Sequence, residues 1–142
     1  MIARRLVPLA TLVTPNLDEA AMLVGEEVGN ELEMTRAARA LVKLGARAAL
    51  VTGGHLPGPE VVDVLVADGA THRFARPRLA TTSTHGTGCT LSAAIAAGLA
   101  HGRALPEAVR DAIDFVHRAM AAAPGLGRGR GPLNHFVPGP TL

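Results

Sequence analysis

The sequence predicts an α/β domain in which helices flank a partly parallel sheet, and three observations support this fold class. Two short apolar segments, residues 9–13 and 48–52, each end in turn-forming residues, as buried strands do. Two more strand-like segments flank Asp68-Gly69, which is a strong hairpin signal. Elsewhere, apolar residues recur at helical spacing. Strands enclosed on both faces normally belong to larger sheets, so we expect the chain to be one portion of a larger fold.

The first two helices are predicted from their capping residues. A helix begins after Asn16 or Asp18 and ends before Gly25. A second helix follows a loop at residues 26–33, with Thr35 as its N-terminal cap and Gly45 as its stop. Both helices therefore lie between the two predicted buried strands.

The remaining elements follow the second buried strand. The hairpin strands are expected at residues 61–67 and 71–74. The turn at 86–88 opens a helix of small residues, and Pro106 stands in the first turn of the last helix. Residues 124–142 are rich in Gly, Pro and Arg and are predicted to form a mostly irregular tail of the 1–142 domain.

Composition narrows the classes of function. With 142 residues, 48% of them hydrophobic, the chain is long enough for one domain with a core and too short for two. Fourteen Lys and Arg against 12 Asp and Glu give a net charge of only +2, and Trp and Tyr are absent. Nucleic-acid binding usually requires a basic stripe and stacking aromatic residues, so no nucleic-acid partner is expected.

Cysteine usage and hydropathy give further exclusions. A single Cys excludes an internal disulfide and a multi-Cys zinc site. The longest run of small apolar residues, 90–100, is well short of the roughly 20 residues that a membrane span needs. Pro8 interrupts the apolar stretch near the start, where no signal-peptide cleavage pattern follows. We therefore expect a cytoplasmic protein without a membrane partner.

The most specific motif is Thr84-His85-Gly86-Thr87-Gly88-Cys89, which continues into a helix of small residues. Its glycines allow close approach of the backbone to a ligand, and the start of the helix directs N–H groups at it. This arrangement suits phosphate. An ordinary tight turn before a packing helix explains the pattern equally well.

Cys89 stands in the first turn of that helix, where the helix dipole and nearby N–H groups favour a thiolate. From there it can accept a proton from a substrate hydroxyl while the adjacent amides hold phosphoryl charge. The alternative is a small buried residue, which most lone cysteines are.

Two further clusters follow the predicted buried strands. Asn16 and Glu19, three residues apart, can share one face at a strand end, where a carboxylate can hold a hydrated magnesium ion. Helix capping explains this pair better on pattern alone. The run from Thr52 through Gly54 follows the other strand and opens onto the same edge, as a nucleotide contact or as a simple turn. The 125–135 tail is either a flexible basic terminus or a loop folded over a site.

Taken in order, these segments resemble the hydroxymethylpyrimidine/phosphomethylpyrimidine kinase family of the ribokinase-like superfamily. The matching motifs lie between about Leu6 and Phe136 and comprise residues 13–20, 53–56, 84–94 and 129–135. Pyridoxal-type kinases are the nearest related group. The resemblance implies a ribokinase-like layered sheet with flanking helices, of which this chain is the C-terminal portion.

The resemblance also implies an activity, namely ATP-dependent phosphorylation of hydroxymethylpyrimidine and its monophosphate in thiamin biosynthesis, with ATP and Mg²⁺ as cofactors. In that family pattern, Gly86, Thr87 and Gly88 form the anion hole and Cys89 takes the place of the catalytic base. The Cys89 segment is the most specific match, because other branches of the superfamily usually carry Asp there.

The family pattern assigns ATP contacts to Asn16, Thr52 and Gly54, and assigns Mg²⁺ to Glu19 through water. Thr52 stands where the family commonly has Lys, so a neutral hydrogen bond replaces a point charge and nucleotide affinity or turnover is expected to fall. The substrate partner is a small pyrimidine, and pyridoxal kinase-like specificity is the alternative.

The family's N-terminal half, which carries most pyrimidine contacts, has no counterpart in this sequence. The chain is therefore a fragment or a truncated form, and a non-catalytic nucleotide-binding module is the second hypothesis for its function. An exposed sheet edge in such a chain favours a homo-oligomer.

Overall fold

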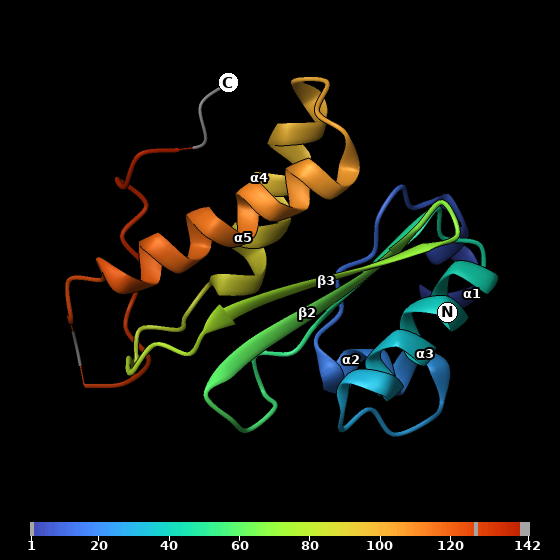
Figure 1. The fold of residues 1–142 in the computed structure, drawn as a ribbon, viewed down its shortest axis with the longest axis horizontal. Coiled ribbons are helices and arrows are strands. Elements are labelled where there is room, and N and C mark those ends of the chain that lie inside the picture. The colour runs from blue at the N-terminus through green and yellow to red at the C-terminus, as the bar shows by residue number, and fades with distance from the viewer. Residues whose placement is uncertain (1, 127, 140–142) are drawn as a thin grey trace. The chain divides into compact units, whose positions relative to one another are not determined.

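The computed structural model describes residues 2–126 and 128–139 and divides into two compact units (Figure 1). Unit 1 is Met1–Arg78, and unit 2 is Leu79–Leu142. The length of the chain predicts one domain, whereas its contacts divide it into these two units. Each unit has its own elements: unit 1 holds a sheet and helices, and unit 2 holds two helices and the tail.

The sheet of unit 1 has three strands in the order β1-β2-β3, all antiparallel. They are β1 (Ala48–Thr52), β2 (Glu60–Ala67) and β3 (Ala70–Pro77). The predicted hairpin is confirmed: Ala67 pairs with Ala70, and both residues of the connecting turn, Asp68 and Gly69, have positive φ. Two-residue turns of that kind match the twist of antiparallel strands.

The strand predicted at residues 9–13 does not form. The chain begins instead with helix α1 (Ile2–Arg5) and the 3₁₀ helix η1 (Val7–Leu9). Pro8 lies in the first two positions of η1, where its fixed φ suits a helical turn and its missing N–H costs no helical hydrogen bond. The apolar character of the run was therefore insufficient to predict a strand.

The segment after η1 runs beside β1 and supplies the parallel part of the sheet. It does so only as two isolated bridges, Val13 to Ala49 and Asn16 to Thr52. Pro15, between them, accepts a hydrogen bond from Thr52 N at 3.0 Å but has no N–H to donate. A continuous ladder cannot form across it, so the predicted partly parallel sheet is parallel only at these bridges.

Helices α2 (Leu17–Val24) and α3 (Glu31–Lys43) lie between this segment and β1 in the chain. The left-handed Gly25 ends α2 as predicted. The prediction that Thr35 caps the next helix is wrong, because Asn30 caps α3 and its side-chain oxygen accepts an N–H of the first turn. Thr35 lies inside the helix, where its hydroxyl donates to a carbonyl one turn earlier at 3.0 Å.

The core of unit 1 lies between these two helices and one face of the sheet. Small and medium apolar side chains fill it, as the absence of Trp and Tyr requires. The β-strand residues of this face pair across the sheet, with Val51 opposite Val64 and Ala49 opposite Val66. The helices contribute Leu17, Ala20, Met34, Ala37, Ala38 and Leu41.

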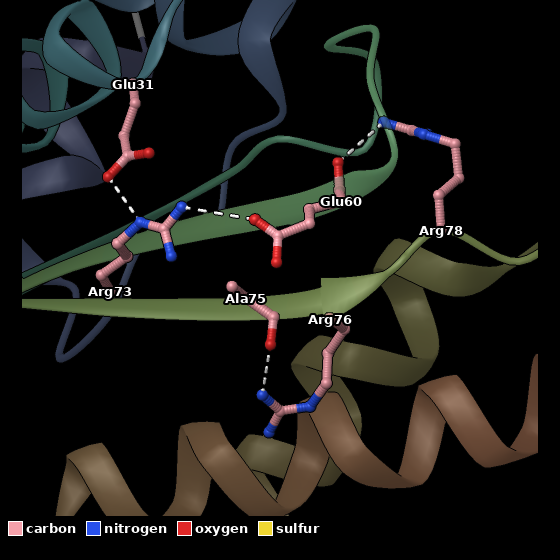
Figure 2. Close-up of polar contacts among 6 residues, drawn as sticks. All are labelled: Glu31, Glu60, Arg73, Ala75, Arg76 and Arg78. Atoms are coloured by element: carbon pink, nitrogen blue, oxygen red, sulfur yellow. Dashed lines mark hydrogen bonds and ion pairs between the residues drawn. The ribbon is translucent and has the colours of Figure 1, made fainter.

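Side-chain ion pairs join α3 to the strands of unit 1 (Figure 2). Arg73 on β3 donates from Nε to Glu31 Oε1 at 2.7 Å, and its Nη2 lies 3.8 Å from Glu60 Oε2. All three side chains are about half exposed, so these pairs contribute little to stability.

Unit 2 contains helices α4 (Thr87–Ala100) and α5 (Leu105–Ala121), which pack on each other. Both were predicted, including Pro106 in the first turn of α5. The two backbones approach closely: a Cβ added to Gly98 would lie 3.0 Å from the Cβ of Ala108. The tail residues 124–126 and 128–139 contain no helix or named strand. Within the described ranges, no helix has the length and apolar character needed to cross a membrane.

Candidate functional site

The start of α2 carries the first predicted pair, Asn16 and Glu19. The two residues form a capping box: Glu19 N donates to Asn16 Oδ1 at 2.9 Å, and Asn16 N donates to Glu19 Oε2 at 2.9 Å. The capping interpretation of this pair is therefore confirmed. The Nδ2 amide of Asn16 and the Oε1 oxygen of Glu19 have no hydrogen bond with the described residues, and both groups stay available to a ligand.

A magnesium ion at Glu19 would depend on the oxygen donors around this side chain. Among the described residues, no three His, Cys, Asp or Glu side chains are grouped to hold a metal. One exposed carboxylate oxygen is enough for Mg²⁺ only when phosphate oxygens and waters complete its shell. Glu19 therefore fits a hydrated ion that arrives with a phosphate, and it does not fit a permanently bound metal.

The end of β1 brings Thr52 and Gly54 next to that pair. Thr52 is bridged to Asn16, and its hydroxyl has no hydrogen-bond partner among the described residues. Gly54 is exposed in the turn that follows, and His55 Nδ1 lies 3.7 Å from Asp18 Oδ2. The strand end of unit 1 thus gathers the residues that the sequence placed there.

Asp63 on β2 is a member of this group that sequence reasoning missed. Its Oδ1 accepts the N–H of Gly53 at 3.0 Å, and the side chain is buried. Burial raises the pKa of Asp63 from its ordinary 3.8 to about 6, against the opposing effects of the Gly53 N–H and the Arg76 charge. A lone carboxylate between Val62 and Val64 in an apolar strand was the signal that could have found it.

Unit 2 carries the glycine motif at the start of α4. Gly86 precedes the helix with φ +82°, and no side chain caps it. Thr90 N donates to Gly86 O at 2.9 Å, whereas no described residue accepts the N–H of Thr87, Gly88 or Cys89. A Cβ added at either glycine would meet no atom within 4 Å. The first turn therefore has three amides without a partner among the described residues, and no atom crowds its two glycines.

Cys89 is exposed on this first turn as a free thiol. The alternative interpretation, a small buried residue, is wrong. The Thr87 hydroxyl donates to Thr84 O at 3.2 Å, so the N–H is the Thr87 donor that has no partner among the described residues. An exposed thiol beside unpaired amides can take part in proton transfer at a bound phosphate.

The tail returns to the start of α4. His85 N donates to Gly131 O at 3.2 Å, Thr90 Oγ1 lies 3.0 Å from His135 Nε2, and Asn134 N donates to the last turns of α5. A Cβ on Gly131 would lie 2.7 Å from Ser83 Oγ and 3.2 Å from Leu126 O, so the tail packs closely against Ser83. Of the two interpretations of the tail, the folded loop holds for residues 131–135.

The predicted residues therefore form two groups, one in each unit. Unit 1 brings together Asn16, Glu19, Thr52 and Gly54, for which ATP and metal contacts were predicted, and unit 2 holds Gly86, Thr87, Gly88 and Cys89 in one turn.

Comparison with known proteins gives a consistent result. The family model described as phosphomethylpyrimidine kinase matches residues 1–134. A hydroxymethylpyrimidine/phosphomethylpyrimidine kinase of Rhizobium meliloti (strain 1021) is 50% identical over 138 residues, which cover 95% of this chain and 52% of the relative.

Solved structures of two kinases match most of the chain. An ADP complex of Bacillus subtilis pyridoxal kinase matches with a TM-score of 0.90 and 38% identity over 94% of this chain and 53% of that one. A phosphomethylpyrimidine kinase from Clostridium difficile 630 matches with a TM-score of 0.70 and 34% identity, over 83% of this chain and 46% of that one. The ribokinase-like α/β fold is confirmed, and the chain spans about half the length of these relatives.

Proposed function

The chain belongs to the phosphomethylpyrimidine kinase family, and on that premise we propose that it is the ATP-binding and catalytic portion of a hydroxymethylpyrimidine/phosphomethylpyrimidine kinase. The reaction transfers the γ-phosphoryl group of ATP to the hydroxyl of the pyrimidine, or to the phosphate of its monophosphate, in thiamin biosynthesis. The partner is a small pyrimidine. Because the chain spans about half of its relatives, the proposal for the chain itself concerns the nucleotide side of that reaction.

The observation that carries the proposal is the uncapped start of α4. The N–H groups of Thr87, Gly88 and Cys89 are unpaired among the described residues, and nothing crowds the two glycines. Unpaired amides and the positive end of a helix dipole attract phosphate oxygens. They also stabilise the charge that spreads over the transferred phosphoryl group.

Cys89 supplies the base in this proposal. As the pyrimidine hydroxyl oxygen bonds to the γ-phosphorus, the bond to the ADP oxygen breaks and the hydroxyl proton passes to the sulfur of Cys89, which acts in its thiolate form. The exposure of the thiol and its place in the first turn support this role. A positioned base of this kind contributes roughly 10²- to 10⁴-fold to a rate.

Unit 1 carries its own set of proposed nucleotide contacts. Asn16 Nδ2, the Thr52 hydroxyl and the Gly54 backbone are the free donors in this group, and Glu19 Oε1 is the free acceptor. Glu19 would hold Mg²⁺ through water, and the ion would neutralise phosphate charge. Because Thr52 replaces a common Lys of the family, we expect weak binding of MgATP.

Pyridoxal kinase-like specificity is the second candidate, and one observation favours it. The pyridoxal kinase of Bacillus subtilis superposes with a TM-score of 0.90, against 0.70 for the phosphomethylpyrimidine kinase of Clostridium difficile. Sequence identity over most of the chain favours the pyrimidine kinases, at 50% for the Rhizobium meliloti relative. Parallel assays with pyridoxal and hydroxymethylpyrimidine separate the two.

Titration with MgATP, followed by amide resonances, tests the proposal. The N–H signals of Thr87, Gly88 and Cys89 should shift, since these groups acquire an acceptor on binding. The hairpin residues Asp68 and Gly69 provide the reference signals, because they take no part in the proposal. Unchanged amides at the start of α4 with millimolar nucleotide would refute it.

A further inference from the structure

Arg78, at the end of unit 1, makes an unusual set of contacts with the loop between β1 and β2. Its guanidinium donates to the carbonyls of alternate residues of that loop (Figure 2 shows the contact with Glu60). Nε donates to Gly58 O at 2.8 Å and Nη1 to Gly54 O at 2.9 Å. Nη2 donates to Leu56 O and, at 3.4 Å, to Glu60 O.

These contacts involve all three nitrogen atoms of the Arg78 guanidinium. Arg carries five N–H donors in a rigid planar fork, and here they converge on carbonyls that span the loop. Hydrogen bonds from a charged donor are about twice as strong as neutral ones. Arg78 N also donates to Pro59 O at 2.8 Å, so backbone and side chain hold the same loop. A guanidinium so engaged acts on the loop and leaves little for a phosphate.

The near end of the same loop is held as well. Gly53 N donates to the buried Asp63 at 3.0 Å, and Leu56 N donates to Gly53 O at 3.0 Å. A Cβ on Gly53 would lie 2.1 Å from Val62 O, so the backbone there sits directly against β2. The turn from Thr52 to Gly54 is therefore held at two neighbouring residues, at Gly53 by Asp63 and at Gly54 by Arg78.

We propose that Arg78 is a positioning residue for nucleotide binding, which fixes the 54–60 loop so that Thr52 and Gly54 meet the phosphates in a preformed arrangement. The inference rests on the proposed function, since it assigns a role in the same site. A preformed loop lowers the entropy that must be lost on binding, so loss of the anchor weakens affinity for ATP. It leaves the chemical step, at Cys89, largely unchanged.

The test compares Arg78→Ala and Arg78→Lys with Arg73→Ala as the matched control. Arg73 is another exposed arginine of unit 1, and its partners are carboxylates of α3 and β2. For each full-length variant, MgATP affinity is measured by calorimetric titration, hydrogen exchange is measured at Leu56 N, and thermal unfolding checks the fold.

We expect Arg78→Ala to bind MgATP about tenfold more weakly, because a loop without this anchor must be ordered on binding, and to exchange the Leu56 amide faster. Arg78→Lys keeps the charge but reaches fewer carbonyls, so it should recover part of the affinity. Arg73→Ala should bind within about twofold of the unaltered chain. If Arg78→Ala does not fold, the lysine variant carries the comparison.

Two outcomes overturn the inference while the proposed function stands: unchanged MgATP affinity in the folded Arg78 variants, or an equal loss in Arg73→Ala. Failure of the unaltered chain to bind MgATP is a different result, because it refutes the proposed function itself.

Discussion

The starts of helices α2 and α4 solve the same problem in opposite ways. Every helix begins with N–H groups that lack a partner inside the helix. In α2 the Asn16 and Glu19 side chains take up two of these groups at 2.9 Å. In α4 no side chain caps the first turn, and the amides from Thr87 to Cys89 stay unpaired among the described residues.

The difference shows which groups each helix start can offer to a ligand, namely side-chain atoms in α2 and backbone amides in α4. A capped helix gains roughly 1 kcal/mol and offers a ligand only its spare side-chain atoms. An uncapped helix forgoes that stability and keeps its amides for an anion. Gly86 allows the uncapped start of α4. Its φ of +82° is one that glycine adopts readily, and glycine has no side chain that could cover the first turn.

The largest expected effect concerns the uncapped helix. Cys89→Ala should lower kcat for phosphoryl transfer about 100-fold or more, because the hydroxyl proton loses its acceptor. The KM for ATP should change little, since the amides that hold the phosphate are backbone groups. Steady-state kinetics with hydroxymethylpyrimidine measures both constants. A variant that retains the full kcat would exclude the thiol as base and leave the open amides as a binding feature only.

Asp63 sharpens the comparison, because it satisfies another amide of unit 1 at the cost of a buried carboxyl group. With a folded pKa of about 6, above the ordinary 3.8, the folded state holds the proton more tightly than the unfolded state. The stability from this group is full below about pH 4 and is lost as pH rises through about 6. The loss amounts to as much as about 3 kcal/mol.

Asp63→Asn removes that dependence while its amide oxygen still accepts from Gly53. Urea unfolding at pH 4 and pH 7 should therefore show the stability of the unaltered chain falling relative to the variant as pH rises. Asp68→Asn in the exposed hairpin turn is the control, and its difference from the unaltered chain should be flat. Parallel curves for Asp63→Asn would mean that this carboxyl ionises as it does in the unfolded chain.

The sequence predicted the local features of both helix starts but not their surroundings. The small-residue helix after Gly86 and the hairpin at Asp68 have signals within a few residues, and both are confirmed. The prediction of a strand at 9–13 is wrong. Pro8 favours a helical turn and Pro15 interrupts the pairing with β1, and the apolar content of the run shows neither effect. Arg78 lies 18 to 24 positions along the chain from the carbonyls that it contacts. Only folding brings the arginine and this loop together, so no local sequence signal predicts the contact.

The smallest expected effect tests the capped helix. Asn16→Ala should lower the free energy of unfolding by about 1 kcal/mol, because the N–H of Glu19 loses its acceptor. Asn30→Ala, which removes the cap of α3, is the matched control and should cost a similar amount. Glu19→Gln should lose only a few tenths of a kcal/mol, since Gln also completes a capping box. Urea denaturation without nucleotide measures all three. An Asn16→Ala variant as stable as the unaltered chain would mean that the cap adds nothing to folding, and the side chain would then be kept for the nucleotide alone.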